Sequence, residues 1–358
     1  MAQTAETGAA FRELLDAVAS AEEAFLRGPN AVSDLADVLD GYVWAMALMR
    51  VALLAYVHAD PDRPRFEDIV GPSLKWGGDN PDAFYQLAAV DGRQRYRIRG
   101  IRGDAAYLSL TVYGGPRDGS YGAQRTVATL NHREIDFGPD GRFEVAVGPG
   151  ESGRGRLGLA PDSLFVITRD YLADPVGGRR ARFEIEPEAP APARPCSDAE
   201  LAARFRAAAR FVKEQLAFQP IPLPPGNRVQ PPAPARQAFG WNAADACYAM
   251  GAFDLTPEQA LVVRGRSPEC AFFNVCLWNP FLHSFDARLG RASLNGFQAA
   301  MGPEGHFELV VSARDPGHPN WLATGGRRRG LLWFRWFLAR TVPEPLETEV
   351  LPVEKAGR

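Results

Sequence analysis

The chain has 358 residues, of which 46% are hydrophobic and 23% charged; these are ordinary globular values, and the length predicts two domains or one domain with a large extension. Lysine and arginine number 40 against 43 aspartate and glutamate residues, which gives a net charge of -3. This balance disfavours nonspecific binding to nucleic acid or to an anionic membrane.

The segment 1–75 is expected to be helical. Apolar residues recur at helical spacing in a first helix, at Phe11, Leu14, Leu15, Val18 and Phe25. A second helix is expected from the N-cap candidate Ser33, with apolar residues at Leu35, Val38, Leu39 and Tyr42. It leads into an apolar run over 41–57 that contains Arg50 and is shorter than a spanning helix, which needs about 20 largely uncharged residues. This run therefore favours a buried helix and no membrane span.

The N-terminus and the cysteines favour a cytoplasmic protein. Residues 1–18 have neither a basic start nor an apolar centre, so they do not resemble a secretory signal. The four cysteines, Cys196, Cys247, Cys270 and Cys276, include no C-x-x-C pair, and no histidine follows at zinc-finger spacing. Reduced thiols and no structural zinc are therefore expected.

Short strands are predicted from Ala83 onward, because β-branched and aromatic residues concentrate there between glycine-rich or polar turns. Residues 187–197 are rich in proline and alanine and suit a stiff linker. The capping box formed by Ser197 and Glu200 then opens a helix, and a second proline-rich stretch over 220–235 precedes further strands.

The second strand region repeats the first. The opening motif "DNPDAFY" at 79–85 corresponds to "NAADACY" at 242–248, a shift of 163 (242 minus 79). The dipeptide "RG" at 99–100 corresponds to 264–265 at a shift of 165. "TLN" from 129 and "GPDGRFEV" from 138 correspond to "SLN" from 293 and "GPEGHFEL" from 302, both at a shift of 164. Four blocks in one order indicate that the same supersecondary unit occurs twice.

The predicted fold is therefore mainly β with α decoration. It consists of two repeated antiparallel β-sandwich or jelly-roll-like domains plus an N-terminal helical segment, because each copy has about six short strands separated by turn signals every 8 to 12 residues or so. The expected boundaries are a helical segment over 1–75, a first sandwich over 76–186, a proline-rich linker with one helix over 187–235 and a second sandwich over 236–358. Features kept in both copies are expected to serve the fold, and unmatched features are free to serve function.

In the opening motif, Asp82 and Tyr85 recur as Asp245 and Tyr248, which favours a structural role at a strand entrance. Residues 79–81 are not reproduced in full, so any chemistry in this motif is expected there first. Two aspartates three residues apart could also ligate a cation. The stretch lacks the alternating oxygen ligands of a calcium loop, however, and no metal site is predicted.

The polar residues without a counterpart lie mostly in the second copy. The segment 276–286 contains Trp278, Asn279 and His283, and the segment 314–337 contains His318, Asn320, Trp321 and Arg335. The chain has only five histidines, and these two are candidates for general acid or base; the alternative is a loop histidine bonded to a carbonyl. Arg335 lies inside an apolar run, where an unpaired charge is costly, so it is expected to meet a carboxylate or a ligand anion.

Two stretches, "GDNPDAFYQLAAVDGRQRYRIRG" and "GHPNWLATGGRRRGLLWFRW", resemble the family called domain of unknown function 1214, which is often found with a companion numbered 1254. The family's opening pattern is matched at Asp79, Asn80, Pro81, Asp82 and Tyr85. Its ending pattern is matched at Pro319, Asn320, Trp321, Leu322, Thr324, Gly326, Gly330, Arg335 and Trp336. Ala323 stands where an aspartate is common. The resemblance implies β-rich, jelly-roll-like domains and carries no function with it.

The sequence lacks a dinucleotide-binding glycine motif, a Walker loop, a nucleophile elbow and a zinc-protease motif. Three hypotheses remain: a cofactor-independent enzyme using acid–base chemistry on a hydrophobic small molecule, a small-molecule or carbohydrate-binding sandwich, and a structural homo-oligomer. The first, a lyase, isomerase or hydrolase acting on a terpenoid, steroid or aromatic compound, is favoured. The catalytic candidates are Asp79, Asp82, Tyr85, His318 and Arg335. The substrate-binding candidates are Asn80, Trp241, Trp278, Asn279, His283, Asn320 and Trp321.

Overall fold

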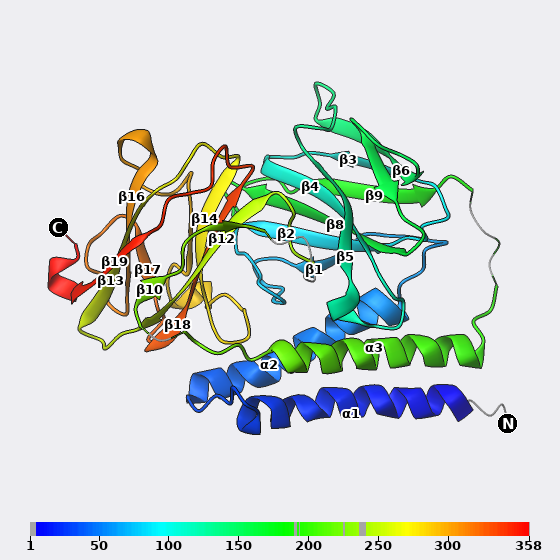
Figure 1. The fold of residues 1–358 in the computed structure, drawn as a ribbon, viewed down its shortest axis with the longest axis horizontal. Coiled ribbons are helices and arrows are strands. Elements are labelled where there is room, and N and C mark those ends of the chain that lie inside the picture. Colours follow the sequence, from blue (N-terminus) through cyan, green and yellow to red (C-terminus); the bar gives the residue numbers. More distant parts are fainter. Residues whose placement is uncertain (1–4, 190–191, 193, 225, 236–240, 358) are drawn as a thin grey trace.

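The computed structural model describes residues 5–357 except 190–191, 193, 225 and 236–240. Two β-sandwiches lie side by side, and a layer of helices lies along one side of them (Figure 1). The long helices are α1 (Ala5–Arg27), α2 (Leu35–Ala52), which a π-helical segment (Leu53–Val57) continues, and α3 (Asp198–Phe218). Short 3₁₀ helices span Tyr121–Ala123, Ala287–Leu289, Pro303–Gly305 and Val353–Lys355.

The first sandwich packs a sheet of order β1-β2-β8-β4-β5 against a sheet of order β7-β6-β3-β9. Its core contains inward-facing residues of both sheets, among them Tyr96, Leu110, Val145 and Val166. The strands are β1 (Glu67–Val70), β2 (Ala83–Ala89), β3 (Tyr96–Ile101), β4 (Ala105–Gly114), β5 (Arg125–Asn131), β6 (Arg142–Pro149), β7 (Arg156–Leu159), β8 (Ser163–Leu172) and β9 (Arg182–Pro187).

The second sandwich packs a sheet of order β10-β12-β18-β14-β15, with β11 also paired to β12, against a sheet of order β17-β16-β13-β19. Its core again joins both sheets and includes Leu261, Val275, Leu309 and Phe334. The strands are β10 (Arg228–Val229), β11 (Ala233–Pro234), β12 (Ala246–Asp254), β13 (Gln259–Arg266), β14 (Phe272–Trp278), β15 (Ser293–Asn295), β16 (His306–Ser312), β17 (Trp321–Ala323), β18 (Arg329–Phe337) and β19 (Glu347–Pro352).

The two sandwiches have the same strand order, so the predicted fold of two repeated sandwiches with an N-terminal helical segment is confirmed.

The glycines of the repeated "RG" dipeptide show why small residues recur there. A Cβ on Gly100 would lie 2.5 Å from the ring of Phe143, and one on Gly265 would lie 2.9 Å from the ring of Phe307. In both copies a phenylalanine therefore packs on a glycine of the central strand.

Three details differ from the sequence expectation. The pairs β6/β7 and β16/β17 are parallel, whereas antiparallel sheets were expected. Strand β1 belongs to the first sheet although it comes from the segment expected to be helical, and β10 and β11 join the second sheet from within the expected linker. Tertiary pairing recruits these short segments, which carry little local signal of their own.

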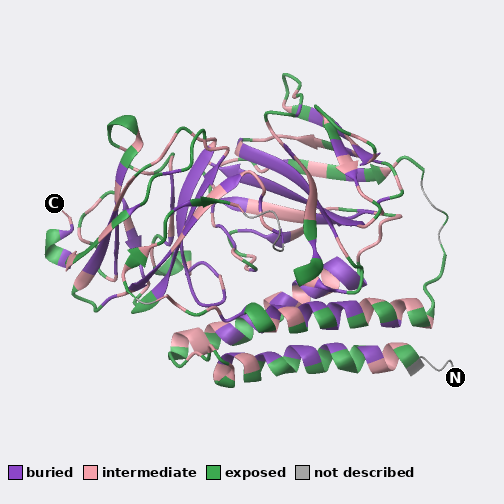
Figure 2. Cartoon of the chain, in the orientation of Figure 1, coloured by how far each residue is buried: buried purple, intermediate pink, exposed green. Residues whose placement is uncertain are grey.

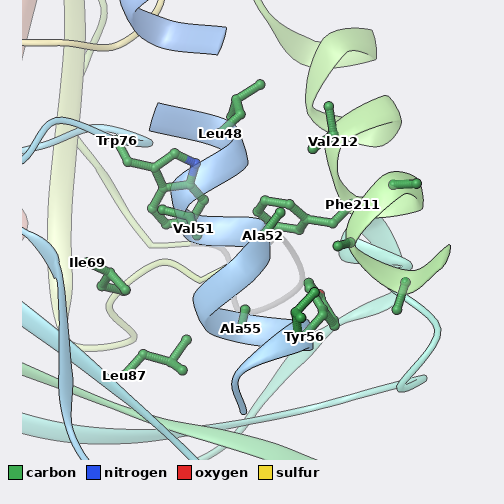
Figure 3. Packing of buried hydrophobic residues seen from close by; sticks show 14 of the residues in the cluster. Leu48, Val51, Ala52, Ala55, Tyr56, Ile69, Trp76, Leu87, Phe211 and Val212 are labelled. Carbon is green, nitrogen blue, oxygen red and sulfur yellow. The ribbon is translucent and has the colours of Figure 1, made fainter. Parts of the chain in front are cut away.

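Helix α2 and its π-helical continuation are packed between the first large sheet and α3. Figure 3 shows Val51, Ala52 and Tyr56 between Leu87 of β2 on one side and Phe211 of α3 on the other. The capping box that opens α3 is present, with the Ser197 side chain accepting from the backbone of Glu200 and the Glu200 side chain from that of Ser197. The helices thereby cover part of the outer face of the first large sheet.

Helix α2 differs from the sequence expectation in its N-cap and in which of its apolar residues are buried. The N-cap is Asp34, not Ser33, because the Asp34 side chain accepts a hydrogen bond from the backbone N–H of Ala36. Leu35 and Leu39, which were expected on the packed face, are 72% and 58% exposed. By length and composition alone Leu35–Val57 is long and apolar enough to cross a membrane, so the absence of a span remains a prediction.

Candidate functional site

The two large sheets meet through their outer faces, where Figure 2 shows buried residues concentrated between the sandwiches. The contact is aromatic: the ring centroids of Tyr107 and Phe337 lie 4.4 Å apart, and those of Tyr171 and Phe272 lie 5.1 Å apart. Strands β2, β4 and β8 supply one side, and β12, β14 and β18 supply the other.

A cavity of about 390 Å³ lies beside this contact, between the sheets and the C-terminal end of α3. Its walls are mainly aromatic, and its polar groups are few. The aromatic lining residues are Trp76, Tyr85, Tyr121, Tyr171, Phe218, Trp241, Tyr248, Trp278 and Trp333. Among the described residues that line it are two arginines, Arg169 and Arg335, and no carboxylate or imidazole.

The two arginines occupy equivalent positions in the repeat. Arg169 of β8 pairs with Tyr85 of β2, and Arg335 of β18 pairs with Tyr248 of β12. Each side chain is only 3% exposed. The two sheets therefore present matching arginine–tyrosine pairs to one cavity.

Neutral groups hold both guanidinium groups. Arg169 Nη2 donates to the Tyr113 hydroxyl at 2.9 Å and to the Trp241 carbonyl at 2.6 Å, and the guanidinium carbon lies 5.2 Å from the centroid of the Tyr85 ring. Arg335 Nη2 donates to the Gly78 carbonyl at 2.8 Å, and its guanidinium carbon lies 4.7 Å from the centroid of a ring of Trp278. Within the described part of the chain, neither arginine forms an ion pair.

Gly78 allows the close approach that brings Arg335 to its carbonyl acceptor. The residue has a φ of 84°, and a Cβ there would lie 3.0 Å from the ring of Trp278. Its backbone N–H donates to the Leu282 carbonyl at 3.0 Å, which ties the loop before β2 to the second sandwich. Both the conformation and the contact favour glycine.

The tyrosines in the cavity are protonated donors at neutral pH. The hydroxyls of Tyr85 and Tyr171 share a hydrogen bond. Burial raises the pKa of Tyr85, although Arg335 and Arg169 oppose the shift, and burial raises the pKa of Tyr248 to about 12. These groups can donate hydrogen bonds to a ligand, but they do not act as bases near pH 7.

The aspartates of the opening motif lie next to the cavity, with their carboxyl groups turned to other partners. Asp79 accepts from Ser284, from the backbone N–H at 2.7 Å and from the hydroxyl at 2.5 Å. Asp82 accepts from the side-chain amides of Asn274 at 2.8 Å and Asn295 at 3.1 Å, both in the second sandwich. Asn80 also accepts from Asn274, at 2.8 Å. These three residues join the sandwiches and do not line the cavity.

His318, Asn320 and Trp321 lie outside this site. His318 and Asn320 line a separate hollow of about 560 Å³ in the second sandwich, and His318 Nε2 lies 3.4 Å from a carboxyl oxygen of Glu308. Trp321 begins β17, which belongs to the four-stranded sheet, whereas Arg335 lies on β18 of the large sheet. The prediction that His318 and Arg335 share one catalytic site is therefore wrong, because neighbouring strands in the sequence belong to opposite sheets.

The remaining candidates divide between the cavity and the core. Trp241 and Trp278 line the cavity. Asn279 donates to Asp40 on α2 at 2.7 Å and does not line it. His283 is buried, and desolvation lowers its pKa to about 4, so at neutral pH it is an uncharged core residue.

Sequence reasoning missed Arg169, Tyr171 and Trp333 and treated Tyr248 only as a repeat partner. A signal for Arg169 was present, because it lies in the apolar run "SLFVITRDYL" as Arg335 lies in "GLLWFRWFLA". The structural pairing aligns these runs at a shift of 166 (335 minus 169), one beyond the shifts of the matched sequence blocks. Arg169 is therefore the counterpart of Arg335 in the repeat, but none of the four matched sequence blocks includes either residue.

No protein-family model matches the chain, and no curated protein is similar to it. A solved structure of an uncharacterized protein from Burkholderia cenocepacia is similar with a TM-score of 0.86 and 28% identity, covering 98% of this chain and 99% of that chain. The VPA0106 protein from Vibrio parahaemolyticus is similar with a TM-score of 0.50 and 11% identity, covering 93% of this chain and 100% of that chain. The first similarity extends over both sandwiches and the helices, and the second concerns the fold alone.

Proposed function

We propose that the cavity between the sandwiches binds a hydrophobic small molecule. The observation that carries this proposal is the aromatic wall contributed by both domains around a volume of about 390 Å³, together with a few convergent polar groups. Ligand sites in proteins occupy about 300–1,000 Å³, often between domains, and combine apolar walls with a small number of polar groups. The cavity meets each of these criteria.

A carbohydrate platform is supported less well. Exposed tryptophans would be needed for it, but Trp278 is 1% exposed and Trp241 is 7% exposed. Their faces pack on other residues; the rings of Trp278 and Trp333, for example, stack with centroids 5.0 Å apart. Enclosed aromatic walls suit a compact apolar ligand better than an open sugar chain.

Catalysis is the second candidate, and the Tyr85 hydroxyl favours it. This hydroxyl is hydrogen-bonded to Tyr171 and lies in the field of Arg169 and Arg335. Such a group could donate a hydrogen bond to a ligand oxygen on which negative charge develops, as in enolate formation, without a cofactor. A base would have to come from the substrate or from water, because no described carboxylate or imidazole lines the cavity.

Binding is tested by titrating the protein with a chemically diverse set of aromatic and alicyclic compounds and following tryptophan fluorescence. Trp333→Ala removes a wall of the cavity, and Trp321→Ala is the matched control, a tryptophan outside it. We expect Trp333→Ala to weaken binding at least about tenfold, because a buried aromatic contact contributes more than about 1.4 kcal/mol. Absence of binding across the set, or equal losses in both variants, would show that the cavity is not a ligand site.

A further inference from the structure

The cavity contains two buried positive charges, and no described carboxylate forms an ion pair with either of them. Arg169 and Arg335 line the same cavity, and both oppose the rise in the pKa of Tyr85 and of Tyr248 that burial causes. A buried charge is costly unless it is paired, and two like charges in one cavity add repulsion to that cost. The described residues therefore leave the charge of the cavity unbalanced.

The nearest acidic groups have other partners and do not line the cavity. Asp245 interacts electrostatically with Arg169, but it accepts from the Tyr107 hydroxyl, and burial raises its pKa. Asp82 interacts electrostatically with Arg335, but its two oxygens accept from Asn274 and Asn295, and burial raises its pKa. Asp79 offers Arg335 only its backbone carbonyl, because its carboxyl group accepts from Ser284. An anion bound in the cavity would contact both guanidinium groups directly, which none of these carboxyl groups does.

Both guanidinium groups retain donors for such an anion. An arginine has five N–H donors. Arg169 makes three hydrogen bonds to described residues, through Nη1 and Nη2. Arg335 also makes three, through Nη1 and Nη2. In the described part of the chain Nε of neither arginine donates a hydrogen bond, so a ligand oxygen can be bound without breaking the bonds that hold the side chains in place.

We infer that the ligand is a hydrophobic organic acid. Its carboxylate is held by Arg169 and Arg335 and accepts a hydrogen bond from the Tyr85 hydroxyl. Its apolar body lies against Trp241, Trp278 and the other aromatic walls. This inference rests on the proposed function and narrows it, because a neutral hydrophobic molecule would leave both charges unpaired.

The experiment compares acids with their amides, which have nearly the same shape and no charge. Benzoate, 2-naphthoate and decanoate are titrated against wild-type protein by calorimetry at pH 7, each beside its primary amide. We expect at least one acid to bind about 10 to 100 times more tightly than its amide, the range expected for charge-assisted hydrogen bonds. Equal affinity within every pair, or tighter binding of the amides, would overturn the inference and leave hydrophobic binding in place.

Variants assign the preference to the two arginines. Arg169→Gln and Arg335→Gln are expected to reduce the acid-to-amide ratio of affinities towards one, and Arg314→Gln, at an exposed arginine, is the control. An acid preference that survives in folded Arg169→Gln and Arg335→Gln proteins would also overturn the inference. If either variant does not fold, the comparison of acid and amide on the wild-type protein still decides it. Failure of all six compounds and of the wider set to bind would overturn the proposed function itself.

Discussion

The two sandwiches share a strand order, yet they surround their equivalent arginines differently. In the pairing with β8 and β18, Arg169 lies opposite Ser109 and Arg335 lies opposite Asn274. Asn274 donates to the Asp82 carboxyl group of the other sandwich, whereas Asp245, the counterpart of Asp82, accepts from the Tyr107 hydroxyl at 2.6 Å. Each copy thus has a buried arginine and an aspartate whose carboxyl group reaches the other sandwich, here called the crossing carboxyl group. The residues around them, such as Ser109 and Asn274, differ between the copies and make the cavity asymmetric.

This comparison indicates which residues serve the fold. Asp82 and Asp245 each reach across to the other sandwich, so their recurrence reflects the junction between the domains. The carboxyl groups do not cap the strand entrance as expected. The backbone carbonyl of each residue accepts there from the strand end of its own copy, from Leu172 and Leu338, while the carboxyl groups bind side chains of the other sandwich. The arginine pair is repeated as well, but among the described residues the Nε of each arginine has no hydrogen-bond acceptor.

The largest effect is expected from removing the crossing carboxyl groups. Asp82→Ala removes one of the acceptors of each of the buried amides of Asn274 and Asn295, which still donate to Asn80 and to the Ala173 carbonyl, whereas Asp245→Ala affects one hydroxyl. We expect Asp82→Ala to lower the free energy of unfolding by about 2–4 kcal/mol and Asp245→Ala by about 1–2 kcal/mol, because each unpaired buried group costs about 1–3 kcal/mol. Urea denaturation measures both. If Asp245→Ala lowered the free energy of unfolding more than Asp82→Ala does, the junction would not depend mainly on Asp82 as proposed.

A second difference between the copies predicts a pH dependence. Asp170 of β8 occupies the position that Trp336 has in β18, and burial raises the pKa of Asp170 to about 7. Because the folded state then binds a proton that the unfolded state releases near pH 4, this group stabilises the fold below about pH 4 and loses that contribution as the pH rises to about 7.

Asp170→Asn isolates this contribution. The free energy of unfolding of the wild-type protein minus that of the variant should fall between pH 4 and pH 7 and stay level above pH 7. The subtraction cancels the opposite trend from His283, whose depressed pKa destabilises the fold as the pH falls towards about 4. A difference that is independent of pH would show that Asp170 is not protonated in the fold.

The smallest effect is expected from ion pairs that the copies share. Arg99 pairs with Glu144 and Glu186, and its counterpart Arg264 pairs with Glu308 and Glu349. These side chains are 31–59% exposed, so Arg99→Ala and Arg264→Ala should each lower the free energy of unfolding by less than about 1 kcal/mol. Because exposed ion pairs contribute at most about 1 kcal/mol, a much larger loss in either variant would mean that these surface groups hold the sandwich together.

The sequence predicted the repeated sandwiches well because strand period and turn residues are local signals. It predicted the packed face of α2 poorly: Leu35 and Leu39 fit a helical pattern, but which face is covered depends on α3 and the sheet. Tertiary partners decide burial, and the sequence pattern does not identify them.

For the site, the sequence pointed to one unusual residue, Arg335, but did not indicate which residues surround it in the fold. Arg335 stood out because a charge interrupted an apolar strand, and the structure places it in the cavity. His318 was grouped with it because the two are close in the sequence, but β17 and β18 diverge into opposite sheets of the sandwich. Residues that are close in the sequence are therefore far from one site where consecutive strands belong to different sheets.

The central claim is that the two repeated arginines jointly bind an acid between the sandwiches. A crystal structure of the protein with the tightest-binding acid of the acid and amide pairs tests it most directly. The account predicts density for the ligand in the cavity, with its carboxylate within hydrogen-bonding distance of both Arg169 and Arg335 and its apolar part against Trp241 and Trp278. Density for the acid elsewhere, or a carboxylate directed away from both arginines, would contradict it.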